Sequence, residues 1–176
     1  MTSVNLRAIQ APLKERYRSD PESAAVITTA RSVPYEASDP QHCVVTPARF
    51  PEVEIRSGLH PAAGGTGTVP CSGDILAAAL VICEESTIRS VAANIGIELE
   101  SVDVEARIHW DFRGTMGVDR TVPVGAVKIE LHSNVKVKDD VDIERARRLL
   151  GGAERYCATL QTLRHGVDVD TRFTLT

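Results

Sequence analysis

The chain has 176 residues, of which 43% are hydrophobic and 25% charged, and its formal net charge is -4. This length and apolar fraction are typical of one globular domain around a single core. Lys and Arg are scattered along the chain, which argues against nucleic acid or an anionic membrane as a partner. The longest uninterrupted apolar run, Ile75 to Cys83, is too short for a membrane-spanning helix. We therefore expect a soluble protein.

The N-terminal residues lack the apolar stretch and the small-residue cleavage site of a secretory signal. A cytoplasmic location is therefore expected, where cysteines stay reduced. The sequence has four of them: Cys43, Cys71, Cys83 and Cys157. No two form a CxxC motif, so the spacing indicates neither a zinc site nor a thioredoxin-type redox site. A functional pair has to be brought together by the fold.

The first third of the chain predicts an N-terminal arm, residues 1–24, followed by short strands. Residues 6–17 favour a surface helix that is interrupted at Pro12. Three β-branched or apolar segments predict strands, at 25–30, 43–46 and 53–56. Residues 59–67 predict a Gly-rich loop, but no GK[ST] follows it, so a phosphate-binding loop is not indicated.

A long helix is predicted next. Ser72 and Asp74 are suited to cap its start, the segment 75–83 is apolar on every side, and Gly96 ends it. A helix that is apolar all round is expected to be buried all round. The sequence therefore places this helix at the centre of a core or of a dimer interface.

The clearest strand signal follows the helix. Apolar and polar residues alternate strictly from Val102 to Phe112, which predicts one dry and one wet face. Residues 127–137 repeat the alternation and are expected to pair with the first strand as an antiparallel meander. A single α+β domain over residues 1–176 follows, because runs of strands rather than a βαβα alternation surround the helices.

The C-terminal part predicts two helices and a strand. Asp139 and Asp140 are expected to cap a helix that is broken at Gly151-Gly152. A second helix is expected over about 153–164, and the alternation over 167–175 predicts a last strand.

From residue types alone, a structural role is the default interpretation for most of the four cysteines. Cys83 lies at the end of the apolar run, where a small buried hydrophobe is the default interpretation. Cys157 lies near the start of a helix, where unpaired N–H groups can favour a thiolate, although a structural role is the default there too. Cys71 is expected beside a helix cap. Cys43 with His42 and His60 matches no closed zinc pattern, and there is no GxSxG nucleophile motif.

Three segments are distinctive in combination and occur in this order: GLHPAAGGTGTVPCSGDILAAALVICEE, DFRGTMGVDRTVPVGAVKIEL and AERYCATLQTLRHGVDV. Together they resemble the OsmC/Ohr family of osmotically induced and organic hydroperoxide resistance proteins. The resemblance extends over residues 58–169, and the N-terminal segment NLRAIQAPLKERYRSDPESA is similar to one OsmC-like branch.

The resemblance implies an OsmC-like fold in an intertwined homodimer, with sheets of both chains around two central helices. It also implies a cysteine-based, peroxiredoxin-type antioxidant peroxidase of a stress response. Cys83 matches the peroxidatic cysteine and Cys157 the resolving one. A thiolate attacks the organic hydroperoxide, becomes a sulfenic acid and forms a disulfide. A dithiol, including one of lipoyl type, restores the thiols. No metal, haem or flavin is implied as a cofactor.

The chain also departs from the family pattern. Family peroxidases commonly carry a Glu ten positions before the reactive cysteine, in partnership with an Arg, whereas this chain has Gly73. The candidate Arg residues are Arg31, Arg49 and Arg56, and the sequence does not choose among them.

Two further departures lie beside the cysteines. Ala158 stands where the family usually has a proline, and Glu84 and Glu85 follow Cys83 directly. Negative charge disfavours a thiolate, although these two side chains are expected to point away from Cys83. The departures favour an alternative, a non-catalytic OsmC-like protein that binds an apolar small molecule in a dimer-interface cavity.

Overall fold

The computed structural model describes residues 4–138 and 141–175. Contacts within the chain form two compact units. The first holds the residues up to Ala78 together with Ala106–Leu131, and the second holds Ala79–Glu105 together with the residues from His132 on. Helix α2 (Ser72–Ile95) and strands β4 (Leu99–His109) and β5 (Lys128–Val137) contribute residues to both units.

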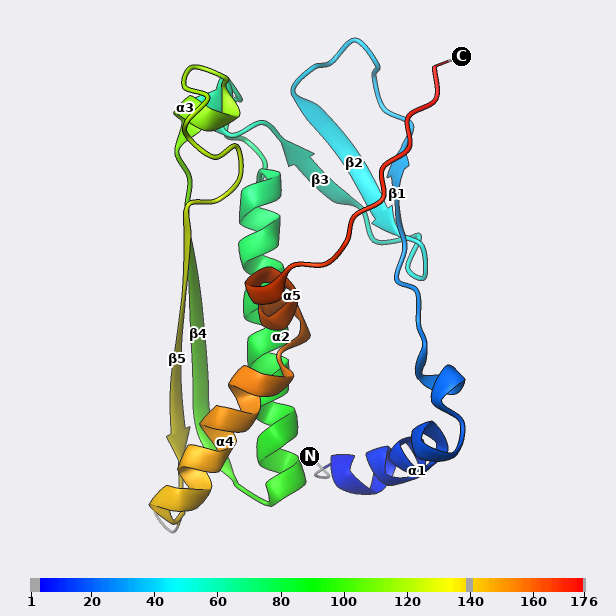
Figure 1. Ribbon diagram of the computed structural model, residues 1–176, viewed down its shortest axis with the longest axis vertical. Helices are drawn as coiled ribbons and strands as arrows, with labels where there is room; N and C mark the ends of the chain where they lie inside the picture. The colour runs from blue at the N-terminus through cyan, green and yellow to red at the C-terminus, as the bar shows by residue number, and fades with distance from the viewer. Residues whose placement is uncertain (1–3, 139–140, 176) are drawn as a thin grey trace. The chain divides into compact units, whose positions relative to one another are not determined.

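The first unit contains a three-stranded antiparallel sheet of β1 (Ala30–Val33), β2 (His42–Pro47) and β3 (Ile55–Gly58), with β2 in the middle (Figure 1). Strands β2 and β3 overlap the predicted segments 43–46 and 53–56. The strand predicted over 25–30 is wrong except for its last residue. Strand β2 ends at Pro47, the partner of Ala30, and the chain then turns, so residues 25–29 have no strand opposite them.

The N-terminal arm is helical and lies on the surface. Helix α1 (Leu6–Ser19) begins after Asn5, whose side chain accepts a hydrogen bond from the Ala8 N–H at 3.0 Å. The predicted interruption at Pro12 does not occur. None of the helix residues is buried, so the carbonyl that Pro12 leaves unpaired remains open to water.

Strands β4 and β5 form a two-stranded sheet, as the sequence predicts. The pairing is antiparallel, because the Val127 N–H bonds the His109 carbonyl at 2.9 Å and the Lys138 N–H bonds the Glu98 carbonyl at 3.3 Å. Half-buried and exposed residues alternate along the predicted part of β4, from Val102 to Ile108. With the helices described below, these sheets confirm the α+β class.

Strand β4 ends earlier than predicted. Asp111 accepts a hydrogen bond from the Arg113 N–H at 3.0 Å and caps a short helix, α3 (Phe112–Thr115). Trp110 and Phe112 therefore leave the strand instead of extending its dry face. The polar side chain at Asp111 competes with the strand ladder for the backbone donors that follow it.

Both predicted ends of α2 are confirmed. The Asp74 carboxylate accepts the Cys71 N–H at 2.8 Å at the first turn, and Gly96 has the left-handed φ of 68° that ends the helix. The Arg145 guanidinium donates to the carbonyl oxygens of Ile95 and Gly96 at 2.9 and 3.0 Å. These bonds satisfy carbonyls that a helix C-terminus leaves without partners.

Burial of α2 on every side is not observed in the chain. Its buried residues follow a spacing of four and form one face: Leu80, Glu84, Ile88 and Ala92. Ile82, in the apolar run, is 68% exposed. The face buried in the second unit packs with Leu149 and Ala153 of α4 (Ile143–Tyr156), which lies against α2 in Figure 1. The sequence placed this helix in a core or in a dimer interface, so burial of its remaining faces stays a prediction.

Helix α4 is not broken at Gly151-Gly152. It continues to Tyr156, and α5 (Ala158–His165) begins after Cys157. A Cβ atom at Gly152 would lie 2.9 Å from Val91 Cγ1, so this glycine permits the close approach of α4 to α2. The predicted cap residues Asp139 and Asp140 lie outside the described residues.

The last predicted strand, 167–175, is wrong. The described residues after α5 have no regular secondary structure, and Phe173 and Leu175 are exposed. A strand pattern needs a partner strand, and none lies opposite this segment in the described chain. Among the described helices, none combines the length and the hydropathy needed to cross a membrane.

The two glycines of α4 give a matched test of the packing. Replacing Gly151 with alanine should raise the free energy of unfolding by up to about 1 kcal/mol, because alanine favours the helix and nothing lies within 4 Å of the new Cβ. Gly152→Ala gains the same propensity but pushes against Val91, so its stability should fall below that of Gly151→Ala. Denaturant unfolding measures both, and equal gains would contradict the close approach.

Candidate functional site

The structure brings Cys83 and Cys157 together in the second unit. Cys83 lies in α2 and is partly exposed, whereas Cys157 lies between α4 and α5 and is fully buried. Both are free thiols. The Cys157 thiol lies close enough to the Cys83 sulfur to lower the pKa of Cys83 by hydrogen bonding. The two residues that the family resemblance singles out are thus direct neighbours, 74 positions apart in the sequence.

The N-terminus of α5 faces the Cys83 sulfur. Because the helix restarts at Ala158, its first N–H groups have no acceptor within the helix. The Thr159 N–H donates to Cys83 Sγ at 3.4 Å, and the preceding Ala158 N–H also helps to lower the pKa of Cys83. The first turn of α5 therefore supplies a backbone donor to the sulfur of a residue on another helix.

The surroundings separate the two thiols in acidity. Burial alone would raise the pKa of Cys83, but the hydrogen bonds from Thr159, Cys157 and Ala158 outweigh it and hold the pKa below its ordinary value. Burial, with added contributions from contacts with Glu84 and Cys83, raises the pKa of Cys157 to about 12. Cys83 is therefore the thiol that ionises first, and Cys157 stays protonated beside it.

Glu84 belongs to this site, although it is not among the predicted site residues. The sequence predicts that it points away from Cys83, and the structure places it on the buried face of α2, 5% exposed and in contact with the Cys157 thiol. Glu85 is different, since it is partly exposed and pairs with Arg89 at 2.6 Å. Glu84 lies four residues after Leu80 and four before Ile88, and this spacing is the sequence signal that could have placed Glu84 on the buried face.

The position of the missing family Glu is filled by an aromatic ring. A Cβ atom at Gly73 would lie 3.2 Å from Trp110 Cζ2, so a longer side chain here would displace the indole. All three candidate arginines lie in the first unit, on β1, after β2 and on β3. Arg56 pairs with Glu54 at 3.3 Å. Whether one of the three acts on Cys83 stays a prediction.

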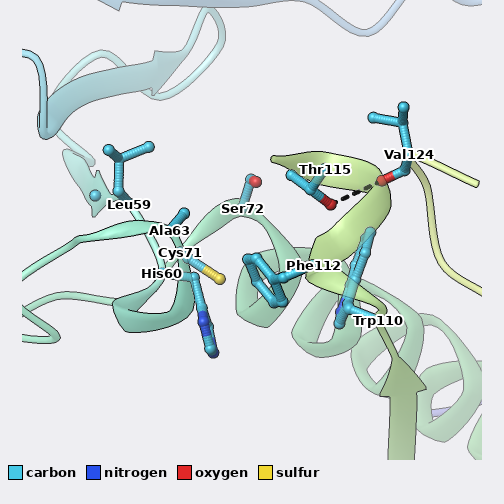
Figure 2. Close-up of a pocket in the computed structure, with 11 residues that line it drawn as sticks. Leu59, His60, Ala63, Cys71, Ser72, Trp110, Phe112, Thr115 and Val124 are labelled. Atoms are coloured by element: carbon cyan, nitrogen blue, oxygen red, sulfur yellow. Dashed lines mark hydrogen bonds between the residues drawn. The ribbon is translucent and has the colours of Figure 1, made fainter. Parts of the chain in front are cut away.

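A second candidate site is a cavity of about 160 Å³ in the first unit. Figure 2 shows aromatic, aliphatic and thiol side chains around it. The His60 and Phe112 rings stack with centroids 4.8 Å apart, and the Thr115 hydroxyl donates to the Val124 carbonyl at 3.0 Å across one wall. The residues that line it are Gly58, Leu59, His60, Ala63, Cys71, Ser72, Gly73, Trp110, Phe112, Thr115 and Val124. The mostly apolar lining suits an apolar ligand.

The other two cysteines, Cys43 and Cys71, belong to the first unit. Cys71 precedes α2, as expected of a cap position, and lines the cavity. Cys43 is exposed on β2, and its neighbour His42 pairs with Asp39 at 2.9 Å. Within residues 4–138 and 141–175, no three His, Cys, Asp or Glu side chains are grouped so that they could hold a metal ion.

Replacing Ala158 with proline should raise the pKa of Cys83, because the substitution removes one N–H donor to its sulfur. Proline suits the first position of a helix, and Cys157 has the extended backbone that a following proline requires, with φ -70° and ψ 100°. The alkylation rate of Cys83 by iodoacetamide, followed against pH by mass spectrometry, reports this pKa. Ala158→Ser keeps the N–H and is the control. An unchanged midpoint in the proline variant would refute the assigned donor.

Comparison with known proteins identifies the family and the fold. The family model for OsmC-like proteins matches residues 65–172, whereas no curated protein matches. The chain is similar to the crystal structure of an organic hydroperoxide resistance protein OsmC from Legionella pneumophila, with 21% identity, 82% of this chain and 94% of that chain covered, and a TM-score of 0.59.

Two further structures are similar in fold. An OsmC-like protein from Mycoplasma pneumoniae has 16% identity, covers 80% of this chain and 89% of its own, and gives a TM-score of 0.62. An organic hydroperoxide resistance protein from Elizabethkingia anophelis, with thiocyanate bound, has 18% identity. The match covers 81% of this chain and 91% of that chain, with a TM-score of 0.59. The family model spans more than half of the chain, and the chain belongs to the OsmC-like family.

Proposed function

We propose that this protein is a thiol-dependent peroxidase that reduces organic hydroperoxides through Cys83 and Cys157. The observation that supports it most is the Cys83 sulfur, which accepts backbone N–H groups of α5 and contacts the buried Cys157 thiol. The structures from Legionella pneumophila and Elizabethkingia anophelis are named as organic hydroperoxide resistance proteins, which agrees with the proposal.

The proposed reaction has three steps. The Cys83 thiolate attacks the peroxide, the O–O bond breaks, the alkoxide leaves as an alcohol after taking a proton, and the sulfur becomes a sulfenic acid. The Cys157 sulfur then attacks the Cys83 sulfur, water leaves and a disulfide forms. An external dithiol, for which a lipoyl compound is a candidate, reduces the disulfide by exchange.

The proposal includes an intertwined homodimer in the cytoplasm. Apolar residues on α2 that are exposed in the single chain, Ile82 at 68% among them, support a partner for this helix. The partner proposed is a second copy of the chain, as the family resemblance implies.

Peroxide consumption tests the proposal. The protein should consume cumene hydroperoxide with a dithiol reductant, and Cys83→Ser should reduce the rate to that of the buffer, because the attacking sulfur is lost. Cys157→Ser should still form a sulfenic acid at Cys83 but no Cys83–Cys157 disulfide in intact-mass spectra.

Cys43→Ser is the matched control, since Cys43 is exposed on β2, and it should retain full turnover. Failure of the thiol-intact protein to consume peroxide with any dithiol, including dihydrolipoamide, would end the peroxidase proposal.

The cavity in the first unit supports a second candidate function, binding of an apolar small molecule without turnover. The sequence-based alternative expected the ligand in a dimer-interface cavity, whereas this cavity is lined within one chain by residues of one unit. Its aromatic and aliphatic lining would bury an apolar ligand with little polar surface left unpaired.

Fluorescence can test this binding because Trp110 lines the cavity and is the single tryptophan of the chain. Titration with propylbenzene should change the emission to saturation. Ala63→Leu, which fills the cavity, should weaken binding by about tenfold.

Ala62→Leu, at an exposed position beside it that does not line the cavity, should not weaken binding. Cys83→Ser should also bind normally. A titration without saturation, together with no copurified ligand in native mass spectra, would count against this function.

A further inference from the structure

Glu84 is a buried acidic side chain that the proposed reaction does not yet use. It lies on the inner face of α2 and is 5% exposed. Its carboxyl group contacts the Cys157 thiol, and its buried Oε2 has no hydrogen-bond partner among the described residues. Burying a carboxyl oxygen without a partner costs stability, so packing does not explain a glutamate at this position.

The second step of the proposed reaction needs a proton acceptor at this place. The Cys157 sulfur attacks as a thiolate, but the thiol is fully buried and its pKa is raised to about 12. Near neutral pH, roughly one Cys157 in 10⁵ would be ionised without help. A base in contact with the S–H group removes this limit, because it takes the proton as the new bond forms.

We propose that Glu84 is this base, and that it takes the Cys157 proton and passes it to the hydroxide that leaves Cys83. The inference rests on the proposed peroxidase function and concerns only the step that forms the disulfide. It follows from the geometry of one site: Glu84 and Cys157 are both buried, the Glu84 Oε2 has no partner among the described residues, and the Thr159 N–H bonds the Cys83 sulfur. Glu84 also lies close enough to the Cys157 thiol, and that thiol to the Cys83 sulfur, to interact by hydrogen bonding.

The step balances without a further reactant. The S–H bond of Cys157 breaks and its proton moves to a Glu84 oxygen, while the sulfur electron pair forms the bond to Cys83. The S–O bond of the sulfenic acid breaks, and its electron pair leaves with the hydroxide. That hydroxide takes the proton from Glu84 and departs as water. Cys157 is oxidised, the Cys83 sulfur is reduced from the sulfenic level, and Glu84 returns to a carboxylate.

The adjacent glutamate supplies a matched control. Glu84→Gln keeps the size of the side chain and removes the base, whereas Glu85→Gln makes the same change at a partly exposed side chain that pairs with Arg89. Each protein receives one equivalent of cumene hydroperoxide in a single turnover. Dimedone trapping follows the sulfenic acid, and intact mass follows the disulfide.

Glu84→Gln should form the sulfenic acid at least as fast as the unchanged protein, since it removes negative charge near Cys83, and should form the disulfide about 10²-fold more slowly. Glu85→Gln should match the unchanged protein in both steps. Raising the pH should recover the second step of Glu84→Gln, because hydroxide then ionises Cys157, and a merely structural defect would not be recovered in this way.

The outcomes separate the two proposals. If the unchanged protein forms no sulfenic acid, the peroxidase function fails and this inference fails with it. If the unchanged protein completes both steps and Glu84→Gln forms its disulfide equally fast, the function stands and Glu84 is not the base. Rapid sulfenic acid formation in Glu84→Gln also shows that the variant is folded, so a slow second step cannot come from unfolding.

Discussion

The close packing of α4 on the second half of α2 is the constraint on which the thiol site depends. Gly152 lets α4 approach Val91, and Leu149 and Ala153 bury against the same face of α2. Near one end of this contact, Arg145 binds the last carbonyls of α2. Because α4 is held along its length, the position of its C-terminal end is fixed relative to α2. That end is where Cys157 meets Cys83.

The break between α4 and α5 gives the two thiols different chemistry. If the helix continued through Cys157, the N–H groups of Ala158 and Thr159 would be used inside it and could not reach Cys83. The break frees these donors for the Cys83 sulfur and leaves Cys157 in the dry interior. The bonds of Gln161 and Arg164 to Glu154, at 2.7 and 2.9 Å, hold α5 against the last turns of α4. One irregularity of the backbone therefore lowers the pKa of one thiol while burial raises that of the other.

The departures from the family pattern have structural counterparts. Gly73 lies against Trp110, so the indole occupies the space that a longer side chain would need, and the same indole lines the apolar cavity of the first unit. In the second unit the described groups that act on the Cys83 sulfur are main-chain N–H groups and a thiol. The acidic side chain at this site, Glu84, comes from the helix that carries Cys83 and contacts Cys157.

The sequence by itself determined the features that depend on near neighbours in the chain. Capping by Asp74 and the left-handed Gly96 fixed both ends of α2, the alternation after Val102 fixed the faces of β4, and the motifs around the two cysteines indicated the family. These signals are local, because caps, turns and side-chain alternation act over a few residues.

Only the tertiary structure decided which surfaces have neighbours. The alternation over 167–175 was not enough to make a strand without a partner, and Gly151-Gly152 did not break α4, since Gly152 serves its contact with Val91. Glu84 follows Cys83 directly, yet its role depends on Cys157, more than 70 positions away. The charge and hydropathy of a residue do not specify which distant group will lie against it, because that contact exists only after α4 has packed on α2.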